Sequence, residues 1–229
     1  MIVLGIDTST PLGSTAVLDN GRLVYEYIDN TKASYSKRLL IMIDNALKGA
    51  VINMKRIEGY ALAIGPGSFT GLRIGLSICK GFFAATGKPI IGVDTLDALA
   101  NTLLYPSNLI CPILDARKGE VYSALYKYKD NELNKLVDNM VIDPKRLCSM
   151  IKEPTIFWGD GIEIYRELLL ERLGDMAILT SETKGYSNAA SIAEIGLKIL
   201  ERGDVPNAMT LKPKYIRRSE AEIKWNKME

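Results

Sequence analysis

The stretch VLGIDTSTPLGSTAVLDNGRLVYEY, residues 3–27, decides the fold of this chain. It begins with an apolar run that ends at Asp7, and then turns into a second β-rich run at residues 15–18. The tripeptide Asp-Asn-Gly at 19–21 separates that run from a third one. Such a tripeptide between two β-rich segments is typical of a hairpin turn. The stretch therefore predicts a meander of three antiparallel strands.

The same order of features returns in LICPILDARKGEVYSALYKYKDNELNKLV, residues 109–137. An apolar run ends at Asp115, a Lys-Gly pair forms a turn, and a segment of alternating apolar and polar residues leads to another turn near Asp130. Asp115 thus holds the place that Asp7 holds in the first stretch. We predict that the chain consists of two related halves.

Helices and strands alternate after each meander. In the first half we expect a helix at residues 34–48, a strand at 57–65, a helix at 70–86 and a strand at 89–93. In the second half we expect a helix at 144–152, a strand at 155–161, a helix at 162–173, a strand at 176–180 and a helix at 188–202. Each half then has the order β-β-β-α-β-α, which indicates an α/β fold with helices on the faces of a mixed sheet.

Two such halves predict two lobes, residues 1–104 and residues 105–229 with a basic tail, joined by a hinge at 99–108 and separated by a cleft. This duplicated plan resembles the actin-like ATPase and sugar-kinase (ASKHA) superfamily. In that superfamily the first hairpin of each half faces the cleft and holds nucleotide phosphates and magnesium. The resemblance therefore makes Asp7 and Asp115 candidates for nucleotide binding.

The composition excludes several classes of active site. The chain has 229 residues, of which 47% are hydrophobic and 24% charged, and it contains no histidine. Histidine is the commonest metal ligand and the usual general base near neutral pH, so catalytic triads and His-ligated metals are excluded. The three cysteines are too scattered for a CxxC metal site or a disulfide framework. We predict no catalytic residue and no metal site.

The apolar runs of this chain are far shorter than the roughly 20 residues that a membrane-spanning helix requires. The first ten residues, MIVLGIDTST, lack the basic start and the small-residue cleavage site of a signal peptide. The scattered cysteines suit a reducing compartment. We therefore expect a cytoplasmic protein that has no membrane partner.

A glycine-rich stretch, AIGPGSFTGLRIGLSICKG at residues 63–81, stands where a phosphate loop could be. Its glycine spacing fits neither the P-loop pattern nor the Rossmann pattern. Ser68 remains a candidate for weak anion binding, because helix N-termini attract anions. Otherwise we expect Ser68 or Thr70 to cap a helix on which Gly71 and Gly75 share one face, where another backbone approaches closely.

The two long helices of the first half carry more apolar residues than one sheet-facing stripe requires. This excess predicts a partner subunit, and the alternative is that loops or the other lobe cover the extra surface. The residues that we expect at the interface are Tyr35, Leu39, Leu40, Met42, Ile43, Gly71, Leu72, Arg73, Gly75, Leu76, Cys79 and Phe83.

The C-terminal stretch LKPKYIRRSEAEIKWNK, residues 211–227, mixes basic and aromatic side chains, as nucleic-acid contacts do. The alternative is a solvated terminus, since Glu220 and Glu222 dilute the charge. The basic and aromatic residues are Lys212, Lys214, Tyr215, Arg217, Arg218, Lys224, Trp225 and Lys227.

Five motifs along the whole chain resemble those of the bacterial TsaB (YeaZ) family. They are GIDTST, GPGSFTGLRIGLSICKG, GVDTLDALA, LDARKGEVYSALY and PKYIRR, and they occur in that family's order and spacing. The most specific of the motifs is GPGSFTG followed by LRIG. One departure is Tyr35 before Ser36, where many members have a histidine, and an aromatic side chain at an interface edge could replace it.

The resemblance implies an inactive, actin-like paralogue of the catalytic subunit TsaD. Together with TsaD and the ATPase TsaE, such proteins serve the transfer of a threonylcarbamoyl group to N6 of adenosine 37 in tRNAs that read codons beginning with A. The resemblance also implies binding to TsaD through the helices of the first half, and a homodimer through the same surface when TsaD is absent. We expect no cofactor on this chain, ATP and metal on the partner subunits, and tRNA contact through the complex.

Two other activities compete with this hypothesis. One is a small-molecule kinase or ATPase of the same fold that uses Asp7 and Asp115 with Mg²⁺. The other is a protease, which without histidine would need a Ser-Lys pair, and no sequence feature marks such a pair.

Overall fold

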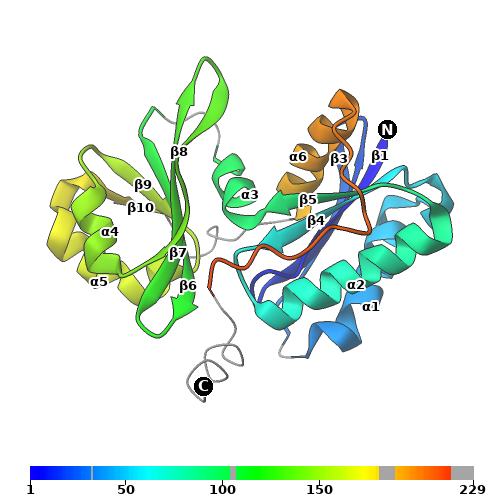
Figure 1. Cartoon of the computed structure of the whole chain (residues 1–229), viewed down its shortest axis with the longest axis horizontal. Coiled ribbons are helices and arrows are strands. Elements are labelled where there is room, and N and C mark those ends of the chain that lie inside the picture. Colours follow the sequence, from blue (N-terminus) through cyan, green and yellow to red (C-terminus); the bar gives the residue numbers. More distant parts are fainter. Residues whose placement is uncertain (32, 104–106, 181–188, 218–229) are drawn as a thin grey trace.

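A five-stranded mixed sheet forms the centre of each of two lobes (Figure 1). The computed structural model describes residues 1–31, 33–103, 107–180 and 189–217. The first half contains β1 (Ile2–Asp7), β2 (Gly13–Asp19), β3 (Arg22–Asp29), α1 (Tyr35–Ala50), β4 (Gly59–Gly65), α2 (Phe69–Thr86), β5 (Ile90–Asp94) and α3 (Thr95–Asn101). The second half contains β6 (Leu109–Arg117), β7 (Glu120–Lys129), β8 (Glu132–Ile142), α4 (Pro144–Met150), β9 (Thr155–Trp158), α5 (Gly161–Leu173), β10 (Ala177–Leu179) and α6 (Ala189–Arg202).

The two sheets have the same topology, which confirms the predicted duplication. Their strand orders are β3-β2-β1-β4-β5 and β10-β9-β6-β7-β8. β1 pairs antiparallel with β2 and parallel with β4, and β6 pairs in the same way with β7 and β9. Each meander thus supplies three of the five strands of its sheet, and β6 takes the central place that β1 takes in the first sheet.

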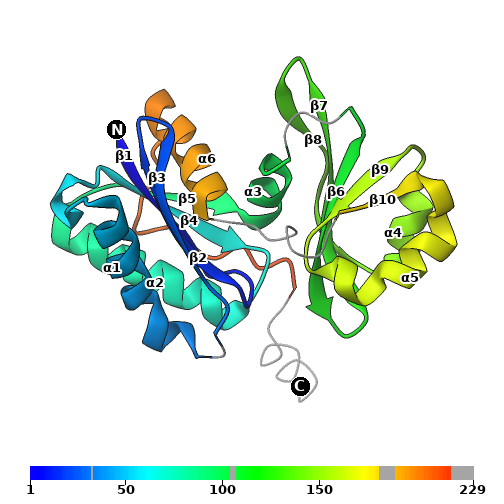
Figure 2. The same cartoon turned by 180° about the vertical axis from the view of Figure 1, so that it is seen from behind.

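Helix α6 packs on the first sheet, although it follows the second half of the sequence (Figure 2). β1 alternates between the two faces of the sheet. Its side chains Ile2, Leu4 and Ile6 face the core under α1 and α2, whereas Val3 faces the core under α6. The predicted division at residue 104/105 is therefore wrong for α6. A sheet with two apolar faces must be covered on both, and α6 covers the face that α1 and α2 leave open.

The predicted hinge at 99–108 is also partly wrong, because it begins inside α3. Leu96, Leu99 and Ala100 of this helix pack in one apolar cluster with Leu114 and Tyr126 of the second sheet. α3 therefore joins the lobes by apolar contact. Within the described residues, no helix is both long enough and apolar enough to cross a membrane.

The start of α2 packs directly on the end of β1. A Cβ atom added to Gly71 would overlap the carbonyl oxygen of Thr8, and one added to Gly75 would lie 2.6 Å from Thr8 Oγ1. The Thr8 hydroxyl donates to the Gly71 carbonyl at 2.8 Å, and the Ser68 N–H donates to the Ser9 carbonyl at 2.6 Å. The close approach that the glycines predict is confirmed, but the backbone that they contact belongs to this chain.

This contact predicts opposite effects for two Gly→Ala substitutions on the same helix. Gly71→Ala should lower the free energy of unfolding by about 1–3 kcal/mol or more, because the added methyl group overlaps a backbone carbonyl. Gly81→Ala should raise it by up to about 1 kcal/mol, because Gly81 is exposed, has no neighbouring atom within 4 Å of an added Cβ, and alanine is the better helix former. Urea unfolding of both variants checks the pair, and equal effects would contradict the packing.

Candidate functional site

A cleft of about 800 Å³ lies between the lobes. The first lobe contributes the loop after β1 and the start of α2, and the second lobe contributes the turn between β6 and β7. Residues 214–217 form a further wall. The cleft therefore lies where the two related hairpins meet, as the sequence analysis predicts.

Asp7 lies behind the cleft wall and is fully buried. Its Oδ1 atom accepts the Ser9 N–H at 2.8 Å and the Ser9 hydroxyl at 2.6 Å. The side of the cleft at this point is formed by Ser9 and Thr10. Asp7 thus fixes the turn after β1, and its carboxylate does not face a ligand in the way that the resemblance to the superfamily implies.

Asp115 does line the cleft, but its carboxylate is already engaged. One oxygen accepts the Arg117 N–H at 2.8 Å, and the other pairs with Arg117 Nη1 at 3.1 Å. Arg117 and Lys118 both have left-handed backbone conformations, with φ of 64° and 57°, which form the tight turn between β6 and β7. The Arg117 side chain therefore stands where the superfamily has a phosphate loop.

The structure brings Asp115 together with Asp160, which the sequence analysis missed. Oδ1 of Asp160 accepts the Asp115 N–H at 2.9 Å. Burial raises the pKa of the Asp160 carboxyl to about 6, and the neighbouring Asp115 charge adds to this rise. The available signal was the position of Asp160 two residues after the apolar run of β9, a strand that pairs in parallel with β6.

The cleft does not fit a magnesium nucleotide as the active members of the superfamily bind one. Asp7 holds Ser9, and Asp115 holds Arg117. Among the described residues, no group of three or more histidine, cysteine or acidic residues is placed to hold a metal ion.

Ser68 caps α2, as predicted, because its hydroxyl accepts the Gly71 N–H at 3.2 Å. It lines the cleft, and its role in anion binding stays a prediction. Beside it the Arg73 guanidinium lies 3.8 Å from the centre of the Phe69 ring. The start of α2 is thus one wall of the cleft.

Most residues predicted at a subunit interface are instead buried inside the first lobe. α1 and α2 lie side by side on one face of the sheet (Figure 2), so their second apolar stripes pack against each other. This contact within the lobe explains most of the excess of apolar residues. The buried members of the predicted set are Tyr35, Leu39, Met42, Ile43, Gly71, Leu72, Gly75, Leu76 and Cys79.

Tyr35 has an internal role that the sequence analysis did not foresee. Its hydroxyl donates to the Thr10 carbonyl at 2.6 Å, and burial raises its pKa. Tyr35 is therefore not an aromatic at an interface edge. Leu40 and Arg73 are the exposed members of the predicted set, and Phe83 is half-buried.

Apolar side chains on α1 and α2 remain exposed or partly exposed, and three of them, Ile41, Ile74 and Ile78, were not in the predicted set. Leu40 is 57% exposed and the neighbouring Ile41 is 60% exposed. Ile74 and Ile78 of α2 are half-buried against the same core. We call Leu40, Ile41, Ile74 and Ile78 the outer face.

The basic C-terminal stretch is only partly available to an external ligand. Lys214 Nζ pairs with Asp94 at 2.9 Å, and Arg217 Nη2 pairs with Glu120 at 3.1 Å. These two side chains therefore bind the protein itself, and contact of the tail with nucleic acid stays an open alternative. The other predicted residues after 217 lie outside the described part of the chain, namely Arg218, Glu220, Glu222, Lys224, Trp225 and Lys227.

Comparisons with known proteins agree on one family. A family model described as "TsaD: tRNA N6-adenosine threonylcarbamoyltransferase" matches residues 28–225. The tRNA threonylcarbamoyladenosine biosynthesis protein TsaB of Bacillus subtilis is 31% identical, over 98% of this chain and 98% of that protein. The protein of the same name from Haemophilus influenzae is 25% identical, over 100% of this chain and 97% of that protein.

Solved structures confirm the fold. YeaZ from Pseudomonas aeruginosa has a TM-score of 0.78 at 25% identity, and the match covers 93% of this chain and 99% of YeaZ. The ethanolamine utilization protein EutJ from Carboxydothermus hydrogenoformans has a TM-score of 0.52 at 13% identity, over 85% of this chain and 89% of that one. The second likeness shows the fold alone, and the predicted actin-like architecture is confirmed.

The raised pKa of Asp160 predicts how stability depends on pH. Between pH 4 and pH 6 the folded protein retains a proton that the unfolded chain has lost, so stability falls as the pH rises through this range. The loss from this group should approach about 2 kcal/mol. Asp160→Asn should remove this pH dependence, because an amide does not titrate in this range. The amide carbonyl can still accept the Asp115 N–H, so the hydrogen bond is kept.

Urea unfolding at pH 4 and pH 7 measures this effect. The wild type should lose more stability than Asp160→Asn between the two pH values. The control is Asp204→Asn, an exposed carboxylate that should leave the difference unchanged. An Asp160→Asn variant with the pH dependence of the wild type would refute the assignment.

Proposed function

This chain belongs to the TsaB (YeaZ) family, and we propose that it is a non-catalytic subunit that binds and activates a TsaD-like threonylcarbamoyltransferase. Relatives with these names are tRNA threonylcarbamoyladenosine biosynthesis proteins, and the chain acts in that pathway. We propose that the complex of the two subunits makes N6-threonylcarbamoyladenosine at position 37 of tRNAs that read codons beginning with A. The full-length match to the Bacillus subtilis TsaB protein carries this proposal.

The state of the cleft supports the absence of catalysis in this subunit. A phosphoryl-transfer site needs carboxylates that hold Mg²⁺ and donors that cradle phosphates. Here Asp115 pairs with Arg117, and Asp7 is buried behind Ser9. We therefore propose that ATP and metal bind to the partner subunits and that this chain has no cofactor of its own.

The outer face supports a protein partner. Leu40 and Ile41 are adjacent, apolar and more than half exposed, and contiguous exposed apolar surface is a feature of protein interaction sites. Burying such side chains is favourable by roughly 25 cal/mol for each Å² removed from water. We propose that this face binds the TsaD-like subunit, and that two copies of the chain associate through it when that subunit is absent.

Two further partners follow from the proposed pathway. A TsaE-like ATPase joins the complex of this chain with the TsaD-like subunit, and tRNA is reached through the complex. Gel filtration of the mixed proteins with and without tRNA tests both contacts.

The double substitution Leu40→Asp and Ile41→Asp tests the outer face. It should weaken binding of the TsaD-like subunit by at least about tenfold, since two charges would be buried without partners. It should also convert the homodimer to a monomer. Isothermal titration calorimetry measures the first effect, and gel filtration measures the second.

Leu136→Asp is the matched control, because Leu136 is 56% exposed on β8 of the second lobe. It should leave both measurements unchanged. Leu72 and Leu76 would be poor choices, since both are buried and a charge there would unfold the lobe. A monomer that ignores the TsaD-like subunit, or a double variant that binds as tightly as the wild type, would overturn the proposal.

A kinase or ATPase of the same fold is the second candidate, and the volume of the cleft is the observation that favours it. Calorimetry of the isolated chain with ATP and Mg²⁺ separates the two functions. Micromolar binding that Asp115→Asn abolishes would favour the enzyme. Asp115 is the better probe than Asp7, whose substitution would also disturb the turn at Ser9.

A further inference from the structure

Residues 211–217, which we call the strap, cross from the first lobe towards the second along one side of the cleft (Figure 1). The first lobe holds the strap through its backbone and core. The Lys214 N–H donates to the Ile64 carbonyl at the end of β4, at 2.7 Å. Leu211 packs against the core beneath α1 and α2. This end of the strap is part of the first lobe.

The middle of the strap packs on the start of α2. The Tyr215 ring stacks on Phe69 with 4.5 Å between ring centres, and its hydroxyl accepts a hydrogen bond from Arg73 Nε at 2.9 Å. The Arg73 guanidinium lies over the Phe69 ring. The strap is therefore fixed to the same helix end that forms the cleft wall.

The far end of the strap reaches the second lobe through Arg217. Nη1 of Arg217 donates to the Ala116 carbonyl at 2.8 Å, and Nη2 pairs with Glu120 at 3.1 Å. These acceptors flank the turn between β6 and β7. The Arg217 side chain is only 23% exposed, so water screens this contact less than it screens a surface pair.

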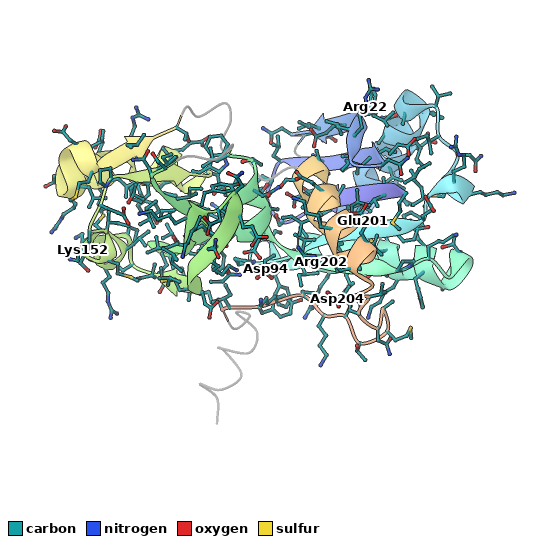
Figure 3. All side chains as sticks on the ribbon, turned by 90° about the horizontal axis from the view of Figure 1, so that it is seen from above. Arg22, Asp94, Lys152, Glu201, Arg202 and Asp204 are labelled. Carbon is teal, nitrogen blue, oxygen red and sulfur yellow. The ribbon has the colours of Figure 1, made fainter. Side chains whose placement is uncertain are left out.

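Asp94 links the strap to the second lobe at another point. Its carboxylate accepts hydrogen bonds from Lys214 at 2.9 Å and from Asn139 at 2.9 Å, and it pairs with Lys135 at 3.4 Å. Lys214 belongs to the strap, whereas Asn139 and Lys135 belong to β8. Figure 3 shows Asp94 where the two halves of the molecule meet.

The lobes are thus joined by two kinds of contact. On the α3 side the contact is mainly apolar, and apolar contacts are not directional. Asp97 of α3 adds a hydrogen bond from the Tyr126 hydroxyl and an ion pair with Lys135. At the strap the contacts are hydrogen bonds and ion pairs, which weaken steeply when their geometry changes. A rotation about α3 would therefore break the Arg217 contacts first.

We propose that the strap is a latch that holds the lobes together across the cleft, with α3 as the hinge and Arg217 as the end that releases. Release of Arg217 lets the lobes separate at the cleft mouth while the apolar contact of α3 persists. The strap also contacts the start of α2, so opening of the cleft and movement of that helix end are coupled.

The distance between spin labels on the two lobes of the full chain tests the latch. Labels at Lys152→Cys in the second lobe and Glu201→Cys in the first lobe are exposed sites far from the cleft (Figure 3). The three native cysteines are buried. Pulsed electron resonance should give a longer mean distance and a broader distribution for Arg217→Met than for the wild type.

Lys212→Met is the matched control, because it removes one charge from an exposed side chain of the same strap. It should keep the wild-type distribution. An Arg217→Met distribution equal to that of the wild type would overturn the latch, provided that circular dichroism shows a folded protein.

Salt gives a second test that needs no substitution in the strap. At about 1 M salt the screening length falls to about 3 Å. The labelled wild type should therefore lengthen and broaden in the same direction as Arg217→Met but by less, because the Arg217 side chain is only 23% exposed. If Arg217→Met does not fold, the distance distributions of the labelled wild type in low and in high salt test the latch. A distribution that is identical in low and high salt would overturn the proposal.

Discussion

The contact between the glycine face of α2 and the end of β1 is the constraint on which the first lobe depends. Gly71 accepts a hydrogen bond from Thr8, and no other residue type leaves room for the Thr8 carbonyl. This contact fixes the position at which α2 begins. It thereby sets the positions of Ser68 and Phe69 at the cleft, and of the strap residue Tyr215 that stacks on Phe69.

Local sequence signals predicted the elements well because the causes of those elements are local. The helix expected at 70–86 spans Phe69–Thr86, and Gly87 ends it in the left-handed conformation, with φ of 68°. The three-strand meanders follow from their turn residues. The repeat of Asp7 at Asp115 was enough to predict two related sheets, since the same order of strands and turns encodes the same pairing.

The sequence could not assign helices to sheets or apolar stripes to neighbours. The apolar face of α6 shows that the helix packs on something, but its partners Val3 and Ala16 are in the other half of the chain. In the same way, the excess of apolar residues on α1 and α2 was satisfied by the contact between these helices. The periodicity of apolar residues predicts that a helix face is buried. Which element covers that face depends on the topology of the fold.

The cleft shows the same limit for polar residues. Asp7 and Asp115 hold equivalent places in the repeat, yet one is buried under Ser9 and the other pairs with Arg117. Asp160 and Arg217 enter the site from distant parts of the chain, through strand pairing and through the strap. The position of a residue in a repeat therefore predicts its place in the backbone. The contacts of its side chain decide whether it can bind a ligand.

A chain whose cleft carboxylates bind its own backbone and side chains keeps the architecture of a nucleotide site while using its polar groups for stability. The exposed apolar residues Leu40 and Ile41 lie on the opposite side of the α1 helix from the sheet, away from those groups. Hydrogen bonds of this kind restrain the loops around the cleft, and the shared core beneath α1 and α2 holds these surface helices in one arrangement within the first lobe. Such pre-organisation reduces the entropy lost on association. A cleft whose carboxylates are engaged within the chain and an exposed apolar helix face are therefore compatible with one another and favour a role in binding.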